Sequence, residues 1–275
     1  MDYIEVSMTN FGDFDPEIAM AQLSGMGFES FAETDSGLQG YIGEDDYREV
    51  PVIAYLQQMF DEHGIVFALK KIAAQNWNAI WESAYEPVTI AGKCQVRAPF
   101  HNPELGMQYD IVIEPKMSFG TAHHETTSLM LELLLAEDIT GKRVLDMGCG
   151  TGVLAILAYK MQAAQVVAID NDDWAFANAT DNMLKNEAAP VMVIQGEVSS
   201  IPSPGYDLII ANINRNVLLN DIPAYAGFLN RKGTLLVSGF YEHDLDQIRQ
   251  VADQAGLLYV GHKTANQWVG AKFVR

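Results

Sequence analysis

The sequence predicts an α/β protein with a doubly wound, mostly parallel sheet, preceded by a small α+β domain. Two observations carry this prediction. From about residue 118 onward, short apolar runs typical of buried strands alternate with segments of helical periodicity, which indicates a parallel sheet with helices on both faces. The elements before that point follow a different order, and a chain of 275 residues is long enough for one large and one small domain.

Residues 1–70 are predicted to form the small domain. A strand over 3–9 precedes a helix over 15–27, where Asp15 is a suitable N-cap and Pro16 lies in the first turn. The elements that follow are strands over 28–34 and 38–43, joined by a hairpin turn, a helix over 48–64 and a strand over 65–72. This βαββαβ order is that of ferredoxin-like domains.

Residues 71–117 are predicted to be a linker with a small sheet that leads into the second domain. The segment 75–85 has the pattern of a short helix, and the segments 88–100 and 107–115 resemble strands. Prolines 87, 99, 103 and 115 punctuate the stretch, as is typical of a connector.

Residues 118–275 are predicted to form the second, larger domain. Its helices are expected over 125–138, 153–162, 173–186, 216–229 and 244–256. Its strands are expected over 143–148, 166–170, 191–197, 206–213, 233–240, 257–263 and 267–275. Because strands and helices alternate through most of this list, we expect a Rossmann-like layered architecture.

Composition excludes several classes of protein. With 49% hydrophobic and 19% charged residues, the chain is globular rather than disordered. The longest apolar runs are shorter than the roughly 18–20 residues of a membrane span, and the N-terminal segment lacks the features of an export signal. Two cysteines form neither a disulfide framework nor a zinc-binding spacing, so we expect a cytoplasmic protein.

The net charge of −19 is concentrated at the N-terminus. Residues 1–70 hold 14 acidic residues against Arg48 and Lys70, a balance of −12. Such a surface repels phosphate backbones, so no direct nucleic-acid binding is expected, whereas a basic partner would be attracted. Solubility alone is an equally good explanation of the charge at this stage.

The stretch 144–152, VLDMGCGTG, predicts a nucleotide-binding loop between a strand and a helix. It offers Gly148 and Gly150 near the ligand, with Asp146 ahead of them. The dinucleotide fingerprint would require glycine where Val153 stands, and the triphosphate-binding P-loop pattern is missing. An acid beside the loop suits a cationic ligand better than a phosphate.

Two further strands are predicted to place polar residues at the same edge of the sheet. One ends in Asp170, 22 residues after Gly148, where a carboxylate can accept hydrogen bonds from both ribose hydroxyls. Helix capping is the alternative role for this residue. The other strand ends at Asn212 and Asn214. A ligand with a ribose, a positive sulfonium and no phosphate is S-adenosylmethionine, and the stretch 144–170 closely resembles the class I methyltransferase pattern.

A second resemblance covers nearly the whole chain. The segments MSFGTAHHETT at 117–127 and DLIIANINRNVL at 207–218, together with the two-domain plan, resemble the ribosomal protein L11 methyltransferase family. This resemblance implies cofactor contacts at Thr127, Gly148, Asp170 and Asn212, with a covering loop that includes Phe119 and Gly120. The family commonly has glycine where Ala122 stands here, so alanine would be strained if the position requires a positive φ.

The resemblance implies N-methylation of a basic ribosomal protein, at a lysine side chain or an N-terminal amine, with S-adenosylhomocysteine as the product. Only a neutral amine can attack the methyl group, and a dry pocket lowers an amine pKa from its usual value of about 10.4. Asn212 is expected to orient the amine, and no strong general base is expected. The charge of residues 1–70 then suggests a substrate-recognition role for the small domain.

Other assignments of the same residues are less consistent with the sequence. His123 and His124 next to Glu125 have no further ligands at metal spacing, so no metal is expected. Cys149 fits a small, semi-buried residue of a tight turn better than a nucleophile. Glu197 follows a strand where such folds approach adenine, although a solvent-exposed loop acid is equally consistent. The alternative functions are a class I methyltransferase for another protein or small-molecule amine, a nucleotide-dependent oxidoreductase and a non-catalytic binding module.

Overall fold

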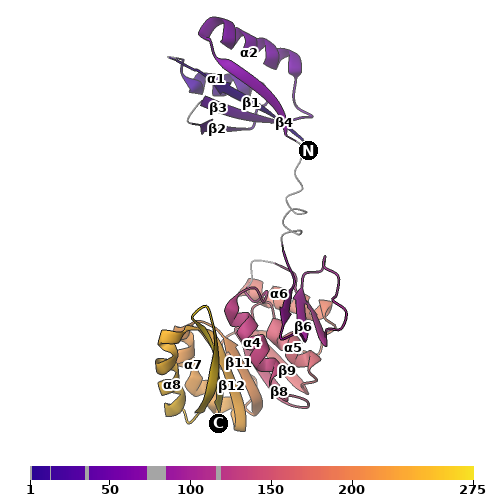
Figure 1. Cartoon of the computed structure of the whole chain (residues 1–275), viewed down its shortest axis with the longest axis vertical. Helices are drawn as coiled ribbons and strands as arrows, with labels where there is room; N and C mark the ends of the chain where they lie inside the picture. Colours follow the sequence, from indigo (N-terminus) through magenta and orange to yellow (C-terminus); the bar gives the residue numbers. More distant parts are fainter. Residues whose placement is uncertain (1, 13, 35–36, 73–84, 116–118) are drawn as a thin grey trace. The chain divides into compact units, whose positions relative to one another are not determined.

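The computed structural model describes residues 2–12, 14–34, 37–72, 85–115 and 119–275 of the chain. These residues fall into two compact units, 1–84 and 85–275 (Figure 1). Each unit has hydrophobic clusters made only of its own residues. The helix predicted over 75–85 lies outside the described residues except for Tyr85. Among the helices within the described ranges, none is long and apolar enough to cross a membrane.

The first unit has the predicted βαββαβ order. Its elements are β1 (Tyr3–Thr9), α1 (Pro16–Gly25), β2 (Ser30–Thr34), β3 (Gly37–Gly43), α2 (Glu49–His63) and β4 (Val66–Ile72). The strands form one sheet in the order β2-β3-β1-β4, and every neighbouring pair is antiparallel. This is the ferredoxin-like topology that the sequence predicts, in which both crossover helices connect strands separated by one neighbour.

Local signals set the ends of both helices in the first unit. The Asp15 side chain accepts a hydrogen bond from the Glu17 backbone N–H, so the predicted N-cap of α1 is confirmed. Helix α2 ends at Gly64, which adopts φ 70° as the residue after the last turn. Leu23 of α1 and Leu56 of α2 belong to one buried cluster with strand residues such as Val6. Both helices therefore cover the same face of the sheet.

The second unit contains a seven-stranded sheet in the order β10-β9-β8-β11-β12-β14-β13. Its strands are β8 (Arg143–Met147), β9 (Gln165–Asp170), β10 (Met192–Gln195), β11 (Tyr206–Asn212), β12 (Leu229–Tyr241), β13 (Leu258–Ala265) and β14 (Trp268–Val274). Its helices are α4 (Glu125–Leu135), α5 (Val153–Lys160), α6 (Asp173–Lys185), α7 (Arg215–Phe228) and α8 (Leu245–Gln254). Only the pairs that involve β14 are antiparallel, so the sheet is mostly parallel, as predicted.

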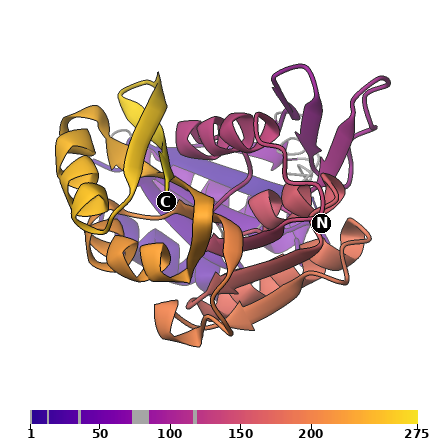
Figure 2. The ribbon, with the colours of Figure 1, turned by 90° about the horizontal axis from the view of Figure 1, so that it is seen from below.

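Helices cover both faces of this sheet (Figures 1 and 2). Alternate strand residues point to opposite faces, so Val144 joins a buried cluster with α4, α5 and α6, while Leu145 joins another with α7 and α8. Because helices bury both faces of this sheet, side chains on both faces are apolar, and the strands are almost continuously hydrophobic.

A small three-stranded sheet also belongs to the second unit. It consists of β5 (Val88–Ile90), β6 (Cys94–Arg97) and β7 (Tyr109–Val112) in that order. Val96 and Ile111 of this sheet are buried in the same cluster as α4 and α5. The predicted linker 71–117 therefore contributes its strands to the core of the second unit, and β4 of the first unit extends two residues past position 70.

The position of a ligand site follows from the order of the strands. Strands β8 and β11 are neighbours, but the helices that follow them, α5 and α7, pack on opposite faces of the sheet. The two connections therefore diverge at the carboxyl ends of these strands and leave space between them. Ligands of doubly wound sheets bind at such a switch point.

Candidate functional site

A cavity of about 940 Å³ lies at the carboxyl ends of β8, β9 and β11. Five of the predicted site residues line it, namely Phe119, Gly148, Gly150, Asp170 and Asn212. Glu197 and Asn214, which the sequence analysis also considered, line the cavity as well. Asp146, Gly120 and Thr127 do not appear on its wall. The structure thus brings five of the predicted residues together at one edge of the sheet. Asp146 and Thr127 are fully buried, and Gly120 is partly exposed in the covering loop.

The glycine loop between β8 and α5 passes close to other segments of the chain. The backbone N–H groups of Gly148 and Cys149 both donate to the Ile169 carbonyl at the end of β9, at 2.8 and 3.1 Å. Gly150 adopts φ 55°, and a Cβ added there would lie 2.3 Å from the Phe119 carbonyl oxygen. A side chain at position 150 would therefore push the loop away from its neighbour.

Asp170 holds the loop from the end of β9. Its Oδ2 accepts a hydrogen bond from the Gly150 N–H at 2.8 Å, and its Oδ1 accepts one from the Asp172 N–H at 3.1 Å. The N-cap of α6 is Asp172, whose side chain accepts from the Ala175 N–H. Because Asp172 performs the capping, helix capping does not explain Asp170. Each Asp170 oxygen keeps a lone pair that can accept a ligand hydroxyl at the cavity wall.

Asp146 is fully buried beneath the glycine loop, at 0% exposure. Its Oδ2 accepts from the Ala155 N–H at 3.1 Å, in the first turn of α5, and its Oδ1 has no hydrogen-bond partner. Burial raises the pKa of Asp146 to about 8 and the nearby Asp170 carboxylate adds to the shift, whereas the bond from Ala155 opposes it. The Asp146 carboxyl thus accepts a hydrogen bond from the first turn of α5 and does not line the cavity.

Asn212, at the end of β11, presents an unsatisfied acceptor. Its Nδ2 donates to the Thr127 hydroxyl at 3.4 Å, whereas its Oδ1 is buried and has no hydrogen-bond partner. Thr127 is itself fully buried in α4. Leaving a buried acceptor unpaired costs about 1–3 kcal/mol, so a ligand N–H or O–H donor at this position would be favoured.

Aromatic rings form another part of the cavity wall. Phe119 and His124 lie 5.0 Å apart, and His124 lies 4.9 Å from Trp268, measured between ring centroids. Trp268 in turn lies 4.0 Å from Tyr241, its partner in the register between β12 and β14. No local pattern in the sequence predicts Trp268 as a wall residue. Only the antiparallel pairing of β14 brings it next to the loop of Phe119, almost 150 residues earlier in the chain.

The covering loop ahead of α4 is held against the glycine loop. Thr151 donates its backbone N–H to the Phe119 carbonyl at 3.0 Å and its hydroxyl to the Gly120 carbonyl at 2.6 Å. Ala122 adopts φ 67° and is 1% exposed. The loop therefore requires the left-handed conformation at the position where the sequence departs from the family pattern, at a cost of about 1–2 kcal/mol for alanine.

The charge of the cavity wall has one sign. Its described residues include the four carboxylates of Asp170, Asp172, Glu197 and Asp221, but neither lysine nor arginine. A phosphate or pyrophosphate would meet only repulsion from these side chains. The wall favours a neutral or cationic ligand.

The side chains considered for metal binding or nucleophilic attack have other roles. His123 hydrogen-bonds through its two ring nitrogens to the backbone carbonyls of Thr121 and Glu86. Within the ranges that the structure describes, no group of three or more His, Cys, Asp or Glu side chains could hold a metal ion. Cys149 is 6% exposed, and burial raises the pKa of its thiol. A thiol of this kind stays protonated and is a poor nucleophile.

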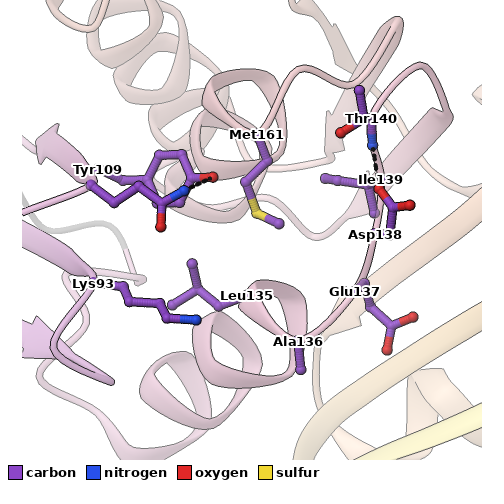
Figure 3. A pocket seen from close by; sticks show the side chains of 10 residues that line it. Lys93, Tyr109, Leu135, Ala136, Glu137, Asp138, Ile139, Thr140 and Met161 are labelled. Atoms are coloured by element: carbon purple, nitrogen blue, oxygen red, sulfur yellow. Dashed lines mark hydrogen bonds between the residues drawn. The ribbon is translucent and has the colours of Figure 1, made fainter.

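A second, smaller cavity of about 370 Å³ is lined by residues that include Lys93, Tyr109, Asp138 and Thr140 (Figure 3). Asp138 and Thr140 precede β8, so this cavity lies at the amino ends of the strands, at the opposite edge from the glycine loop. Ligands of such sheets bind at the carboxyl edge, so the larger cavity is the candidate ligand site.

Comparison with known proteins agrees with this geometry. The family model described as "Ribosomal protein L11 methyltransferase (PrmA)" matches residues 19–275. The chain is 42% identical over 263 residues to a ribosomal protein L11 methyltransferase of Porphyromonas gingivalis, covering 94% of this chain and 90% of that protein. A protein of the same name from Bacteroides fragilis is 40% identical over 261 residues, covering 94% of this chain and 93% of the other.

A solved structure supports the same relationship. The ribosomal protein L11 methylase of Lactobacillus delbrueckii subsp. bulgaricus superposes with a TM-score of 0.64 at 25% sequence identity. The match covers 70% of this chain and 98% of that one. It confirms the predicted class of fold.

The buried carboxyl of Asp146 predicts a pH-dependent stability that an asparagine would remove. In the unfolded chain this group ionises near its ordinary pKa of 3.8, whereas in the folded chain it stays protonated up to about pH 8. Unfolding therefore releases a proton between these values, and the free energy of unfolding falls as pH rises through that window, by up to about 1.4 kcal/mol per pH unit. Above pH 8 this contribution levels off.

Chemical denaturation of the wild type and of Asp146→Asn at pH 5, 6.5 and 8 measures the effect. Other titrating groups are common to both proteins, so the difference between the two profiles isolates Asp146. We expect the difference in free energy of unfolding, wild type minus Asp146→Asn, to decrease steadily from pH 5 to pH 8. Parallel profiles would contradict the assignment of a raised pKa.

Proposed function

This chain belongs to the ribosomal protein L11 methyltransferase family, and we propose that it methylates amino groups of that ribosomal protein. The methyl donor is S-adenosylmethionine, and the acceptors are lysine side chains, the N-terminal amine or both. The observation that carries the proposal is the unpartnered Oδ1 of Asn212, a buried acceptor beside the cavity. An N–H of the acceptor amine, or the ammonium group of the donor, could donate a hydrogen bond to this oxygen.

Residues on the wall match the chemical groups of the donor. The Asp170 carboxylate would hold both ribose hydroxyls, and the loop at Gly148 and Gly150 leaves room for the chain between ribose and sulfur. Glu197 lies on the wall beyond β10, where an exocyclic amine of the base can reach it. The absence of lysine and arginine from the described wall agrees with a sulfonium ligand and disfavours a dinucleotide.

When bound, S-adenosylmethionine supplies an electrophilic methyl group on a positively charged sulfur. The chain's own contribution is to hold the amine nitrogen near 3 Å from that carbon, on the axis opposite the sulfur. Asn212 would accept a hydrogen bond from the amine, and the rings of Phe119, His124 and Trp268 would exclude water around it. An apolar surrounding lowers the amine pKa and so favours the neutral, reactive form.

His124 is not arranged to act as a general base. Its Nδ1 accepts a hydrogen bond from the Thr126 backbone N–H, so the neutral ring carries its proton on Nε2. Both nitrogens of the neutral ring are then occupied, and neither has a free lone pair for the proton of the amine. This agrees with a mechanism in which desolvation, rather than a strong base, prepares the amine.

The first unit is proposed to bind the protein substrate. Residues 1–70 carry a balance of −12, and ribosomal proteins are basic, so long-range attraction would increase the rate of encounter. The second unit would hold the cofactor, since every residue that lines the large cavity lies in 85–275. A ribosomal protein substrate would place the reaction in the cytoplasm, and the acidic charge of residues 1–70 disfavours direct contact with nucleic acid.

The direct test is methylation of the purified ribosomal protein. We expect the wild type to transfer labelled methyl groups from S-adenosylmethionine to ribosomal protein L11, and mass spectrometry of peptides to place them on amino groups. A large-subunit extract serves as the control for selectivity. Label on another protein or on a small amine alone would contradict the proposed substrate, and heat of binding with NAD but none with S-adenosylmethionine would contradict the cofactor.

Asn212→Ala should lower kcat/KM by roughly 10- to 100-fold, as expected for the loss of one or two hydrogen bonds to a ligand. Asn216→Ala is the matched control, because Asn216 lies on the same cavity wall but hydrogen-bonds only to the neighbouring Arg215 side chain among the described contacts. Steady-state kinetics and calorimetry of cofactor binding measure both variants. If Asn212→Ala keeps its turnover and its cofactor affinity, the assigned role is wrong.

The fragment 85–275 should bind S-adenosylmethionine with nearly the affinity of the full chain and should lose methylation of the ribosomal protein. It keeps two hydrophobic clusters of its own and the complete cavity wall, so we expect it to fold. Calorimetry and a methylation assay measure the two activities separately. Methylation of the protein substrate at the rate of the full chain would refute the division of labour.

A further inference from the structure

We propose that Thr151 is a positioning residue that fixes the covering loop, residues 119–124, on the glycine loop. Asn182 of α6 in turn holds Thr151 in place. Neither residue lines the large cavity, and both are fully buried. The inference depends on the proposed function only for the identity of the ligand. It concerns how the wall of the site keeps its shape.

All three polar groups of Thr151 are used between segments of the chain. Its N–H and its hydroxyl donate to the carbonyls of Phe119 and Gly120, at 3.0 and 2.6 Å. Its own carbonyl accepts from the Asn182 Nδ2 at 3.0 Å. Thr151 therefore joins the covering loop on one side to helix α6 on the other.

Close backbone approach makes these bonds possible. Gly120 adopts φ 108°, and a Cβ there would lie 2.8 Å from the Thr151 hydroxyl oxygen. On the facing loop, a Cβ at Gly150 would meet the Phe119 carbonyl. Two loops that touch without side chains between them depend on direct hydrogen bonds to stay in register.

The segment that precedes the covering loop in the sequence also hydrogen-bonds to α6. The Asn182 Oδ1 accepts from the Glu114 N–H at 3.0 Å, so one amide side chain binds residues before the covering loop and the glycine loop at once. One turn later, Asn186 both accepts from the Val112 N–H and donates to its carbonyl, at 2.8 and 2.6 Å. The Asn186 side chain thus satisfies the backbone of Val112 at the outer edge of β7.

The consequence for the site follows from what the covering loop carries. Phe119 lies on the cavity wall at 52% exposure, and His124 is the N-cap residue of α4, whose Thr127 accepts a hydrogen bond from the Asn212 side chain. A loop that drifts away from Thr151 would move Phe119 and His124 off the wall. Helix α6 also begins next to Asp170, whose Oδ1 accepts from the N–H of the N-cap residue Asp172, so the same helix contacts the carboxylate on the wall and, through Thr151, supports the covering loop.

Two substitutions at Thr151 separate this role from general stability. Thr151→Val keeps the shape and the backbone bonds but leaves the Gly120 carbonyl without its hydroxyl donor. Thr151→Ser keeps the hydroxyl and serves as the rescuing control. We expect Thr151→Val to raise the dissociation constant for S-adenosylmethionine by about tenfold or more, the usual effect of one lost hydrogen bond on a preorganised site. Thr151→Ser should stay within about twofold of the wild type.

Backbone hydrogen exchange of the full-length chain without cofactor distinguishes local loosening of the covering loop from a general loss of stability. Exchange should accelerate in residues 119–124 of Thr151→Val, while β8 and α5 keep the protection of the wild type. Equal behaviour of the valine and serine variants, or acceleration that spreads evenly through β8 and α5, would overturn the inference. A wild type that binds no S-adenosylmethionine would instead refute the proposed function, and the exchange comparison would still test the role of Thr151.

Discussion

The hydrogen bond from the Gly150 N–H to the Asp170 carboxylate is the contact on which the site depends. It joins the ends of β8 and β9, and it fixes the carboxylate that faces the cavity. A glycine loop has no side chains of its own to satisfy its backbone, so its polar groups must find partners on neighbouring strands and loops. Ile169, Asp170 and Phe119 supply these partners. The glycine loop therefore keeps its place on the cavity wall through contacts with the end of β9 and with the covering loop.

Two acids at the ends of neighbouring strands, Asp146 and Asp170, differ in exposure and in protonation. Asp170 is partly exposed at the cavity and keeps free lone pairs, whereas Asp146 is enclosed and has a raised pKa. The sequence places both at the ends of adjacent strands and predicts both near the ligand. Only the packing of α5 over β8 shows that Asp146 accepts a hydrogen bond from the first turn of the helix, whereas Asp170 lines the cavity.

The cavity wall combines two kinds of side chain. Its carboxylates come from the end of β9, from the loop after β10 and from α7, and its aromatic rings include Phe119, His124 and Trp268, which lie next to one another. In the proposed reaction, the carboxylates would bind the nucleoside of a cationic donor, and the rings would surround an acceptor amine that must lose its proton. The two environments are compatible because different segments of the chain provide them.

The sequence by itself determined the order of elements, the ferredoxin-like and doubly wound topologies, and the edge of the sheet where Gly148, Asp170 and Asn212 meet. These features follow from local periodicity, from capping residues such as Asp15 and from the rule that parallel strands share a carboxyl edge. Only the tertiary structure decided that Asp146 and Thr127 lie behind the wall, that Trp268 lies on it and that Thr151 joins two loops. Burial and long-range pairing set these positions, and neither leaves a local pattern in the chain.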